Sequence, residues 1–175
     1  MHKAIGILAL ALASITSTAA AGPLYGTTGS FFESAFCKKY GCVLVTSGPL
    51  DPQRYPGVVN YTYRLTGGAT VQIGRDSKKV IGSASLNFEG AAFATAALGK
   101  GGEVVAAFAK AVTGQTFANS YATTCIQQVR AEGFTICRPL DAGAYRLIGQ
   151  GALAGQGMNG KPYQDTLTLV ILKPN

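Results

Sequence analysis

Apolar and polar residues alternate over three successive segments in the first half of the chain, which is the pattern of half-buried β-strands. Turn sequences separate the segments: Gly67-Gly68 lies between the first and the second, and Asp76-Ser77-Lys78 lies between the second and the third. The alternation therefore predicts a three-stranded antiparallel meander. Its strands are residues 58–66, 69–75 and 80–88.

Strand patterns return near the C-terminus. Residues 142–153 are apolar and rich in glycine, and Asn159-Gly160 is the strongest two-residue hairpin signal in the sequence. Residues 166–172, TLTLVIL, then place an apolar side chain at every second position on one face. These features predict a C-terminal hairpin in the same sheet.

Between the two groups of strands, apolar residues recur at the spacing of helices. Asn87 can cap a first helix that runs to Gly99, and residues 103–112 carry a continuous apolar stripe. A further helix is predicted over residues 116–132, where Gly133 would end it. These stripes are typical of helices that pack on a core.

The predicted order is a helix, a strand, the meander, several helices and the final strands. Runs of strands and runs of helices in separate parts of a chain indicate an α+β fold. We therefore expect one antiparallel sheet, made of the meander and the C-terminal hairpin, with helices packed on one face. The length of 175 residues suits one folded domain, which we assign to residues 22–175.

Residues 1–21 have the order of a secretory signal peptide. A lysine at position 3 precedes an apolar run from Ala4 to Ala13, and the segment ends in Ala19-Ala20-Ala21. The apolar run is too short to cross a bilayer, and no later stretch is long enough to form a transmembrane helix. The segment predicts export to the periplasm or to the extracellular space.

The chain has four cysteines, and in an exported chain such an even set favours disulfides. Three pairings of the four are open, and local geometry favours Cys37–Cys42. A capping box of Ser30 and Glu33 predicts the start of a helix, and Gly41 predicts its left-handed end. Cys37 and Cys42 would touch at that helix end, ahead of a short buried strand at residues 43–45.

The second pair, Cys125–Cys137, follows from reach along the two elements that flank Gly133. Cys125 lies about 12 Å before this glycine at the rise of a helix. Cys137 lies about 13 Å after it at the rise of a strand. If the strand folds back along the helix, the two sulfurs become level. Zinc and redox sites usually have closer CxxC spacing, so we predict structural disulfides and expect neither a metal nor a cofactor.

The residues that the chain lacks restrict its chemistry. His2 is the only histidine, and it falls within the predicted leader. Ser-His-Asp and Cys-His catalysis and histidine metal sites are therefore excluded from the exported chain. The sequence also contains no GxSxG, SxxK or P-loop motif. Catalysis is less expected than binding.

The chain is basic, with 15 Lys and Arg against 8 Asp and Glu and a net charge of +7. The cations are scattered, whereas nucleic-acid binding surfaces concentrate them, so we expect no nucleic acid as a partner. A positive surface of this kind is attracted to anionic polymers or lipids of a cell envelope.

The meander predicts where a binding site would lie. If every second residue faces the core, the intervening ones form an outer sheet face of arginine, hydroxyl and amide groups. Arginine on such a face suits a carboxylate or a phosphate, although one face of a sheet commonly just meets water. The candidate ligand-binding residues are Arg64, Gln72, Ser83, Ser85 and Arg146.

Two functions from different classes remain. The first is a non-catalytic envelope module that binds a protein partner or an anionic ligand on the outer face or its loops. The second is a small secreted hydrolase of polysaccharide or peptidoglycan, which would use two carboxylates among Glu89, Glu103 and Asp165. The sequence leaves the oligomeric state open.

Overall fold

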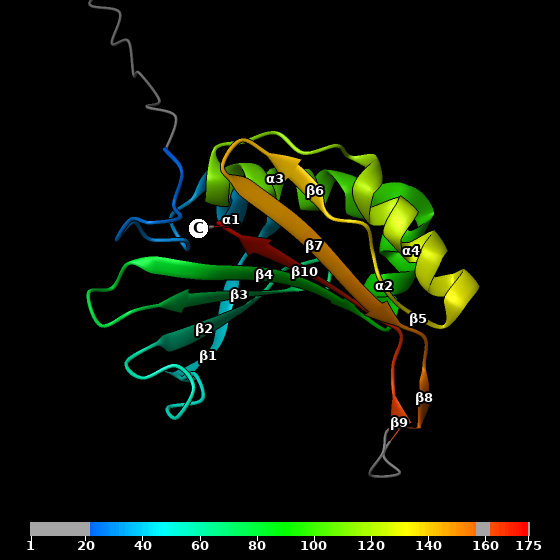
Figure 1. Ribbon diagram of the computed structural model, residues 1–175, viewed down its shortest axis with the longest axis horizontal. Helices are drawn as coiled ribbons and strands as arrows, with labels where there is room; N and C mark the ends of the chain where they lie inside the picture. Colours follow the sequence, from blue (N-terminus) through cyan, green and yellow to red (C-terminus); the bar gives the residue numbers. More distant parts are fainter. Residues whose placement is uncertain (1–21, 157–161, 175) are drawn as a thin grey trace, which may run out of the picture.

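In the computed structural model, the described residues are 22–156 and 162–174, and they form an α+β fold built on one antiparallel sheet of eight strands (Figure 1). The predicted leader and the predicted Asn159-Gly160 turn lie outside the described residues. The strands follow one another across the sheet in the order β1-β2-β3-β4-β10-β7-β5, and β6 also pairs with β7. Their bounds are β1 Val43–Pro49, β2 Val59–Arg64, β3 Thr70–Arg75, β4 Ile81–Glu89, β5 Phe134–Ile136, β6 Leu140–Ala142, β7 Tyr145–Ala152 and β10 Thr166–Leu172. A separate pair, β8 Gly155–Gln156 and β9 Pro162–Tyr163, joins β7 to β10.

The predicted meander is confirmed as β2, β3 and β4, and the strand at residues 166–172 is confirmed as β10. The C-terminal strands join the meander because β10 pairs with β4 on one side and with β7 on the other. The helices lie on one face of this sheet, as predicted (Figure 1). Their bounds are α1 Ala35–Tyr40, α2 Ala91–Thr95, a π-helical turn η1 Ala96–Lys100, α3 Gly101–Thr113 and α4 Ser120–Glu132.

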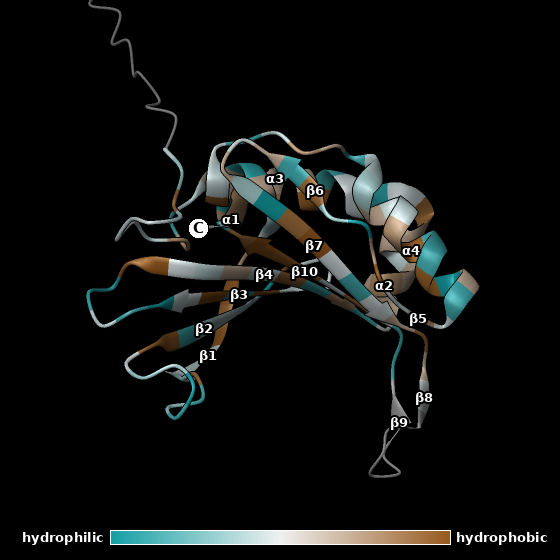
Figure 2. Cartoon of the chain, in the orientation of Figure 1, coloured by the Kyte–Doolittle hydropathy of each residue, from teal (hydrophilic) through white to brown (hydrophobic). Residues whose placement is uncertain are grey.

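The core lies between the helices and the inner face of the sheet. The strand registers align apolar residues in rows across the central strands, and their side chains are fully buried. β10 is accordingly one of the most hydrophobic strands (Figure 2). One such row is Val71, Leu86 and Leu169, and the next is Ile73, Ala84, Ile171 and Leu147.

Both predicted disulfides are present. Cys37 and Cys42 are bridged with their Cα atoms 4.8 Å apart, and Cys125 and Cys137 are bridged with theirs 5.4 Å apart. At the first bridge Gly41 has the predicted left-handed conformation, with φ 65°. The backbone N–H groups of Gly41 and Cys42 both donate to the Cys37 carbonyl, which completes the helix end.

The start of α1 differs from the prediction. Ser30 and Glu33 form no capping box, and the helix begins at Ala35, where the Ser34 hydroxyl accepts a hydrogen bond from the Cys37 N–H at 3.2 Å. Phe31 explains the shift because its ring is buried in the core, 5.4 Å from the Tyr63 ring and 6.2 Å from that of Phe108. Packing of that ring takes precedence over the local capping signal.

Two further helix starts were also wrong in the prediction. Asn87 does not cap a helix, because it pairs with Thr70 of β3 and with Thr168 of β10 inside β4, and α2 begins after Gly90. Likewise α4 begins at Ser120 rather than at residue 116, since the preceding segment buries Phe117 while it connects α3 to α4.

The strand predicted at residues 43–45 is present, but the prediction that it is buried is wrong. These residues open β1, and Val43, Leu44 and Val45 are 63%, 48% and 50% exposed. The reason is topological: β1 ends the sheet and, among the described residues, pairs only with β2, so the helix layer does not reach it. A run of apolar residues does not by itself distinguish a central strand from an edge strand.

Candidate functional site

The outer face of the sheet, where the candidate ligand-binding residues were predicted, carries no helix in the described part of the chain (Figure 1). Gln72 of β3 and Ser85 of β4 are directly paired, and Ser83 lies two residues along β4, opposite Gly74. Arg64 of β2 lies opposite Thr70, which is two residues from Gln72. Four of the five residues are therefore brought together on adjacent strands.

Arg146 does not join this group. It lies on β7, four strands from Arg64, which corresponds to about 19 Å across the sheet. Its guanidinium is already paired with Asp141 of β6, with Nε–Oδ1 2.6 Å and Nη2–Oδ2 3.0 Å. The hydrogen bonds from Arg146 hold the pKa of the Asp141 carboxyl below its ordinary value of 3.8. This geometry gives Arg146 a structural partner at the sheet margin.

Sequence reasoning missed the extent of the polar surface. One row of polar side chains crosses five strands from β2 to β7, because the registers place each residue opposite the next. The alternation in residues 166–172 already placed Thr168 on the outer face, but the position of β10 in the centre of the sheet was needed to align it. The row consists of Arg64, Thr70, Asn87, Thr168 and Gln150.

Arg64 occupies the end of this row that lies beside the sheet edge. It faces Val43 across the β1–β2 pair, and it forms no ion pair with any residue that the structure describes. Together with Val43 and Val45 it lines a shallow hollow of about 330 Å³. The hollow therefore combines apolar side chains with one exposed guanidinium.

The edge beside this hollow is long and open. β1 has seven residues, VLVTSGP, without a charged side chain, and a bulge between Leu44 and Thr46 interrupts its pairing with β2. As the terminal strand it leaves one row of backbone N–H and C=O groups without a neighbouring strand in the described residues. Such an edge can accept an added strand from another chain.

The carboxylates predicted for a hydrolase are placed as follows. Glu89 ends β4, and Asp165 precedes β10 at the neighbouring strand end. The Asp165 carboxylate accepts a hydrogen bond from the Ala154 N–H at 2.6 Å, which gives it a structural partner. Glu103 lies apart from both, in the first turn of α3. The hollow beside Arg64 and the groove described below are lined by none of the three.

Comparisons with protein-family models, with curated proteins and with solved structures gave no match to this chain. Within residues 22–156 and 162–174 no helix has the length and apolar character to span a membrane. The same residues contain no group of three or more His, Cys, Asp and Glu side chains able to hold a metal ion.

Proposed function

We propose that the protein is an exported, non-catalytic binding module of the cell envelope that takes an extended segment of a partner protein along β1. The observation that carries this proposal is the open edge: seven uncharged residues whose first three side chains are about half exposed or more. Export is supported by the predicted leader and is compatible with the two disulfides.

Strand addition would use two kinds of contact. The unpaired backbone groups of β1 would form main-chain hydrogen bonds with the incoming segment, and Val43, Leu44 and Val45 would bury apolar area against its side chains. Burial of apolar surface contributes roughly 25 cal/mol per Å². Together these contacts favour a segment with alternating apolar residues.

Arg64 would supply selectivity. It stands beside Val43 and Val45 without an ion-pair partner among the described residues, so a carboxylate on the bound segment can pair with its guanidinium. We therefore place the anionic group of the partner near Arg64, while Gln72, Ser83 and Ser85 line the adjoining sheet face.

The test is site-specific photo-crosslinking of the exported protein in its own cells. A benzophenone side chain at position 45 should capture a partner, whereas the same group at position 172, an exposed apolar position on β10, should not. The variant Val43→Lys/Val45→Lys should abolish capture because charged residues on an edge oppose strand addition. Arg64→Ala should weaken capture, and added salt should have the same effect.

Two results would contradict the proposal. Equal capture at positions 45 and 172 would mean that β1 has no special role. Capture only of a second copy of this chain would replace the foreign partner with a dimer. Unfolding of the variants must be measured in parallel, and surface changes of this kind should alter stability by less than about 0.5 kcal/mol.

A further inference from the structure

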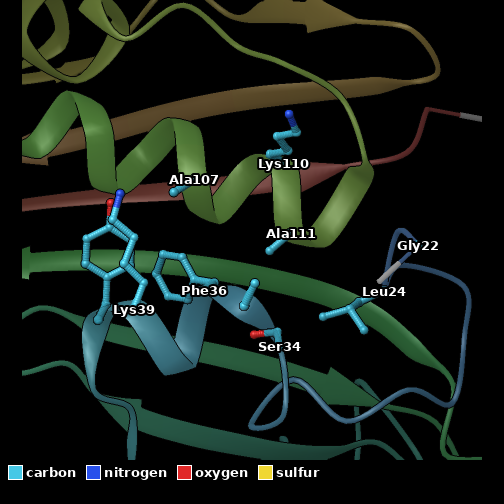
Figure 3. Close-up of a pocket in the computed structure, with 10 residues that line it drawn as sticks. Gly22, Leu24, Ser34, Phe36, Lys39, Ala107, Lys110 and Ala111 are labelled. Carbon is cyan, nitrogen blue, oxygen red and sulfur yellow. The ribbon is translucent and has the colours of Figure 1, made fainter. Parts of the chain in front are cut away.

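A second surface feature lies on the opposite layer of the molecule, between α1 and α3. It is an apolar groove of about 300 Å³ (Figure 3). Phe36 and Ala35 of α1 line one side, Ala107 and Ala111 of α3 line the other, and Leu24 lies at the end formed by the N-terminal segment. The volume lies at the lower end of the range of about 300–1,000 Å³ that is typical of small-molecule sites.

The walls of the groove are fixed by the backbone, so the groove exists before a ligand enters. The first described residues run beside the last turn of α3, where the N–H groups of Leu24 and Tyr25 donate to the carbonyls of Ala111 and Val112 at 3.3 and 2.8 Å. The Cys37–Cys42 bridge holds the end of α1. Ala107 and Ala111 are one helical turn apart, and their small side chains leave the space open.

The interior of the groove offers no polar group in need of a partner. Ser34 lines it, but the Ser34 hydroxyl is already hydrogen-bonded to the Cys37 N–H. No side-chain nitrogen or oxygen buried in the described residues lacks a hydrogen-bond partner. The groove therefore favours a hydrocarbon over a polar occupant.

The rim has the opposite character. Lys39 of α1 and Lys110 of α3 both border the groove, both are exposed, and their ammonium groups lie at separate points of the rim (Figure 3). The Lys39 ammonium lies 5.1 Å from the centroid of the Tyr40 ring, which favours its position at the mouth. Among residues 22–156 and 162–174 no carboxylate lines the groove, and neither lysine forms an ion pair with another of these residues. The rim is therefore complementary to an anion.

We propose that this α1–α3 groove binds a single-chain anionic amphiphile, with its hydrocarbon chain against Phe36 and Ala107 and its carboxylate or phosphate headgroup at the basic rim to which Lys39 and Lys110 belong. The apolar interior and the basic rim each account for one half of such a molecule. The site is independent of β1 and of the partner proposed there.

The first experiment measures binding of laurate to the exported, disulfide-bonded protein by calorimetry, below the micelle concentration. Laurate and dodecyl phosphate should both bind, dodecanol should bind more weakly, and butyrate and inorganic phosphate should not bind. Binding of laurate no tighter than that of butyrate would overturn the proposal. Attachment only to vesicles that contain anionic lipid, without binding of the single-chain probes, would also overturn it in favour of a membrane surface.

Variants then separate the two halves of the site. Lys39→Gln/Lys110→Gln should weaken laurate about tenfold and leave dodecanol unchanged, whereas Lys38→Gln, outside the groove, should change neither. Ala107→Leu should fill the groove and weaken both ligands at least tenfold. Ala131→Leu, at an exposed position in α4, is the matched control.

Circular dichroism and intact mass would show that each variant is folded and bridged. Unchanged laurate affinity in the double lysine variant would refute the headgroup assignment, and unchanged affinity in a folded Ala107→Leu variant would refute the groove. Partner capture at β1 should persist in Ala107→Leu, so failure of the groove would be distinguishable from failure of the strand-addition proposal.

Discussion

The two ends of the sheet are constructed differently. β1 ends one side as a seven-residue strand without charge, and its apolar side chains meet solvent. On the other side β7 is bordered by β5 and β6, which have three residues each and are separated by a segment containing Arg138 and Pro139. Short edge strands and charge both discourage pairing with another chain.

The helix layer accentuates this difference. α4 packs directly on the inner face of β7, where Gly149 and Gly151 leave room for it. A Cβ atom at Gly149 would lie 2.7 Å from the Cys125 sulfur. The Tyr121 hydroxyl accepts a hydrogen bond from the Gly149 N–H at 2.9 Å, and the backbone N–H of Cys137 donates to the Gly149 carbonyl. The β7 end is therefore held by packing, hydrogen bonds and a disulfide together, while the β1 end is held mainly by β2 and the corner at Cys37–Cys42.

The role of each disulfide depends on its surroundings. Cys125–Cys137 joins α4 to the chain that leaves β5, so it clamps a helix onto the sheet. Cys37–Cys42 only closes the end of α1 and fixes where β1 begins. Cys125–Cys137 therefore stabilises the packing of a helix on the sheet, and Cys37–Cys42 positions the open edge strand.

Removal of a disulfide should lower stability more than any other change, and the loss should differ between the two ends. The bridged cysteines are 12 residues apart at the β7 end and 5 apart at the β1 end. On loop entropy, Cys125→Ala/Cys137→Ala should lower the free energy of unfolding by about 3 kcal/mol and Cys37→Ala/Cys42→Ala by about 2 kcal/mol. Urea unfolding would measure both, after mass spectrometry has verified the remaining bridge. The opposite order would contradict the proposed difference between the ends.

Replacement of a strand glycine by alanine should give the second-largest difference in stability between the two ends. Gly151→Ala places a Cβ against the Val129 side chain and 2.8 Å from the Thr166 carbonyl oxygen, so it should destabilise by about 1–3 kcal/mol. Gly48→Ala on β1 meets no atom within 4 Å and should change stability by less than about 0.5 kcal/mol. The midpoints of urea unfolding would test this, provided that the variants unfold with the same dependence on urea concentration. A tolerated Gly151→Ala would mean that α4 is not closely packed on β7.

Removal of one tyrosine hydroxyl at each end should give a smaller difference in stability. Tyr121→Phe leaves the buried Gly149 N–H without its partner, which should cost about 1–2 kcal/mol. Tyr40→Phe is the counterpart beside β1, where the exposed hydroxyl donates to the Glu103 carbonyl at 3.4 Å, and its effect should be near zero. Thermal unfolding at pH 7 would compare the two. Equal losses would indicate that the Tyr121 hydroxyl is not specifically required.

The same tyrosine predicts a dependence on alkaline pH. Burial raises the pKa of the Tyr121 phenol above its ordinary value of 10.0. The unfolded chain therefore ionises first, and the contribution of Tyr121 to stability is complete below pH 10.0 and declines as the pH rises above it. The stability difference between the wild type and Tyr121→Phe should narrow above that pH in urea titrations. A constant difference would show that the phenol is equally accessible in both states.

The sequence predicted the elements whose signals are local. Alternation located the meander and β10, and glycines located the ends of α1, α3 and α4. The bridges were also predictable because each is set by reach within one or two elements. Helix starts were less predictable: at Phe31 and Asn87, burial of a ring and pairing on both sides of a strand overrode the capping signals.

The candidate site was only partly predictable for a related reason. Alternation placed Arg64, Gln72, Ser83 and Ser85 on one face, and they do lie on adjacent strands. The order of strands across the sheet is a long-range property, and it separates Arg146 from that group and leaves β1 at the edge. The α1–α3 groove depends on the packing of two helices far apart in sequence, and no local pattern indicates it.

The smallest expected effect concerns the two arginines. The Asp141–Arg146 pair is exposed, and the hydrogen bonds from Arg146 lower the folded pKa of Asp141 below 3.8. Its contribution to stability is therefore present above pH 3.8 and is lost as the pH falls through the lowered value. Asp141→Asn should be slightly destabilising at pH 7 in low salt, and the effect should disappear in strong acid or in 1 M salt, as urea midpoints would show.

Arg64→Ala sharpens the contrast, because Arg64 has no such partner among the described residues. It should leave the free energy of unfolding unchanged at pH 7 while it weakens capture at β1. Arg146→Ala should lower stability slightly and leave capture unchanged. Its guanidinium is paired with Asp141 at the β7 end and lies about 19 Å from Arg64 across the sheet. Equal effects of the two variants on capture would return both arginines to one shared site and remove the distinction between an open and a closed end of the sheet.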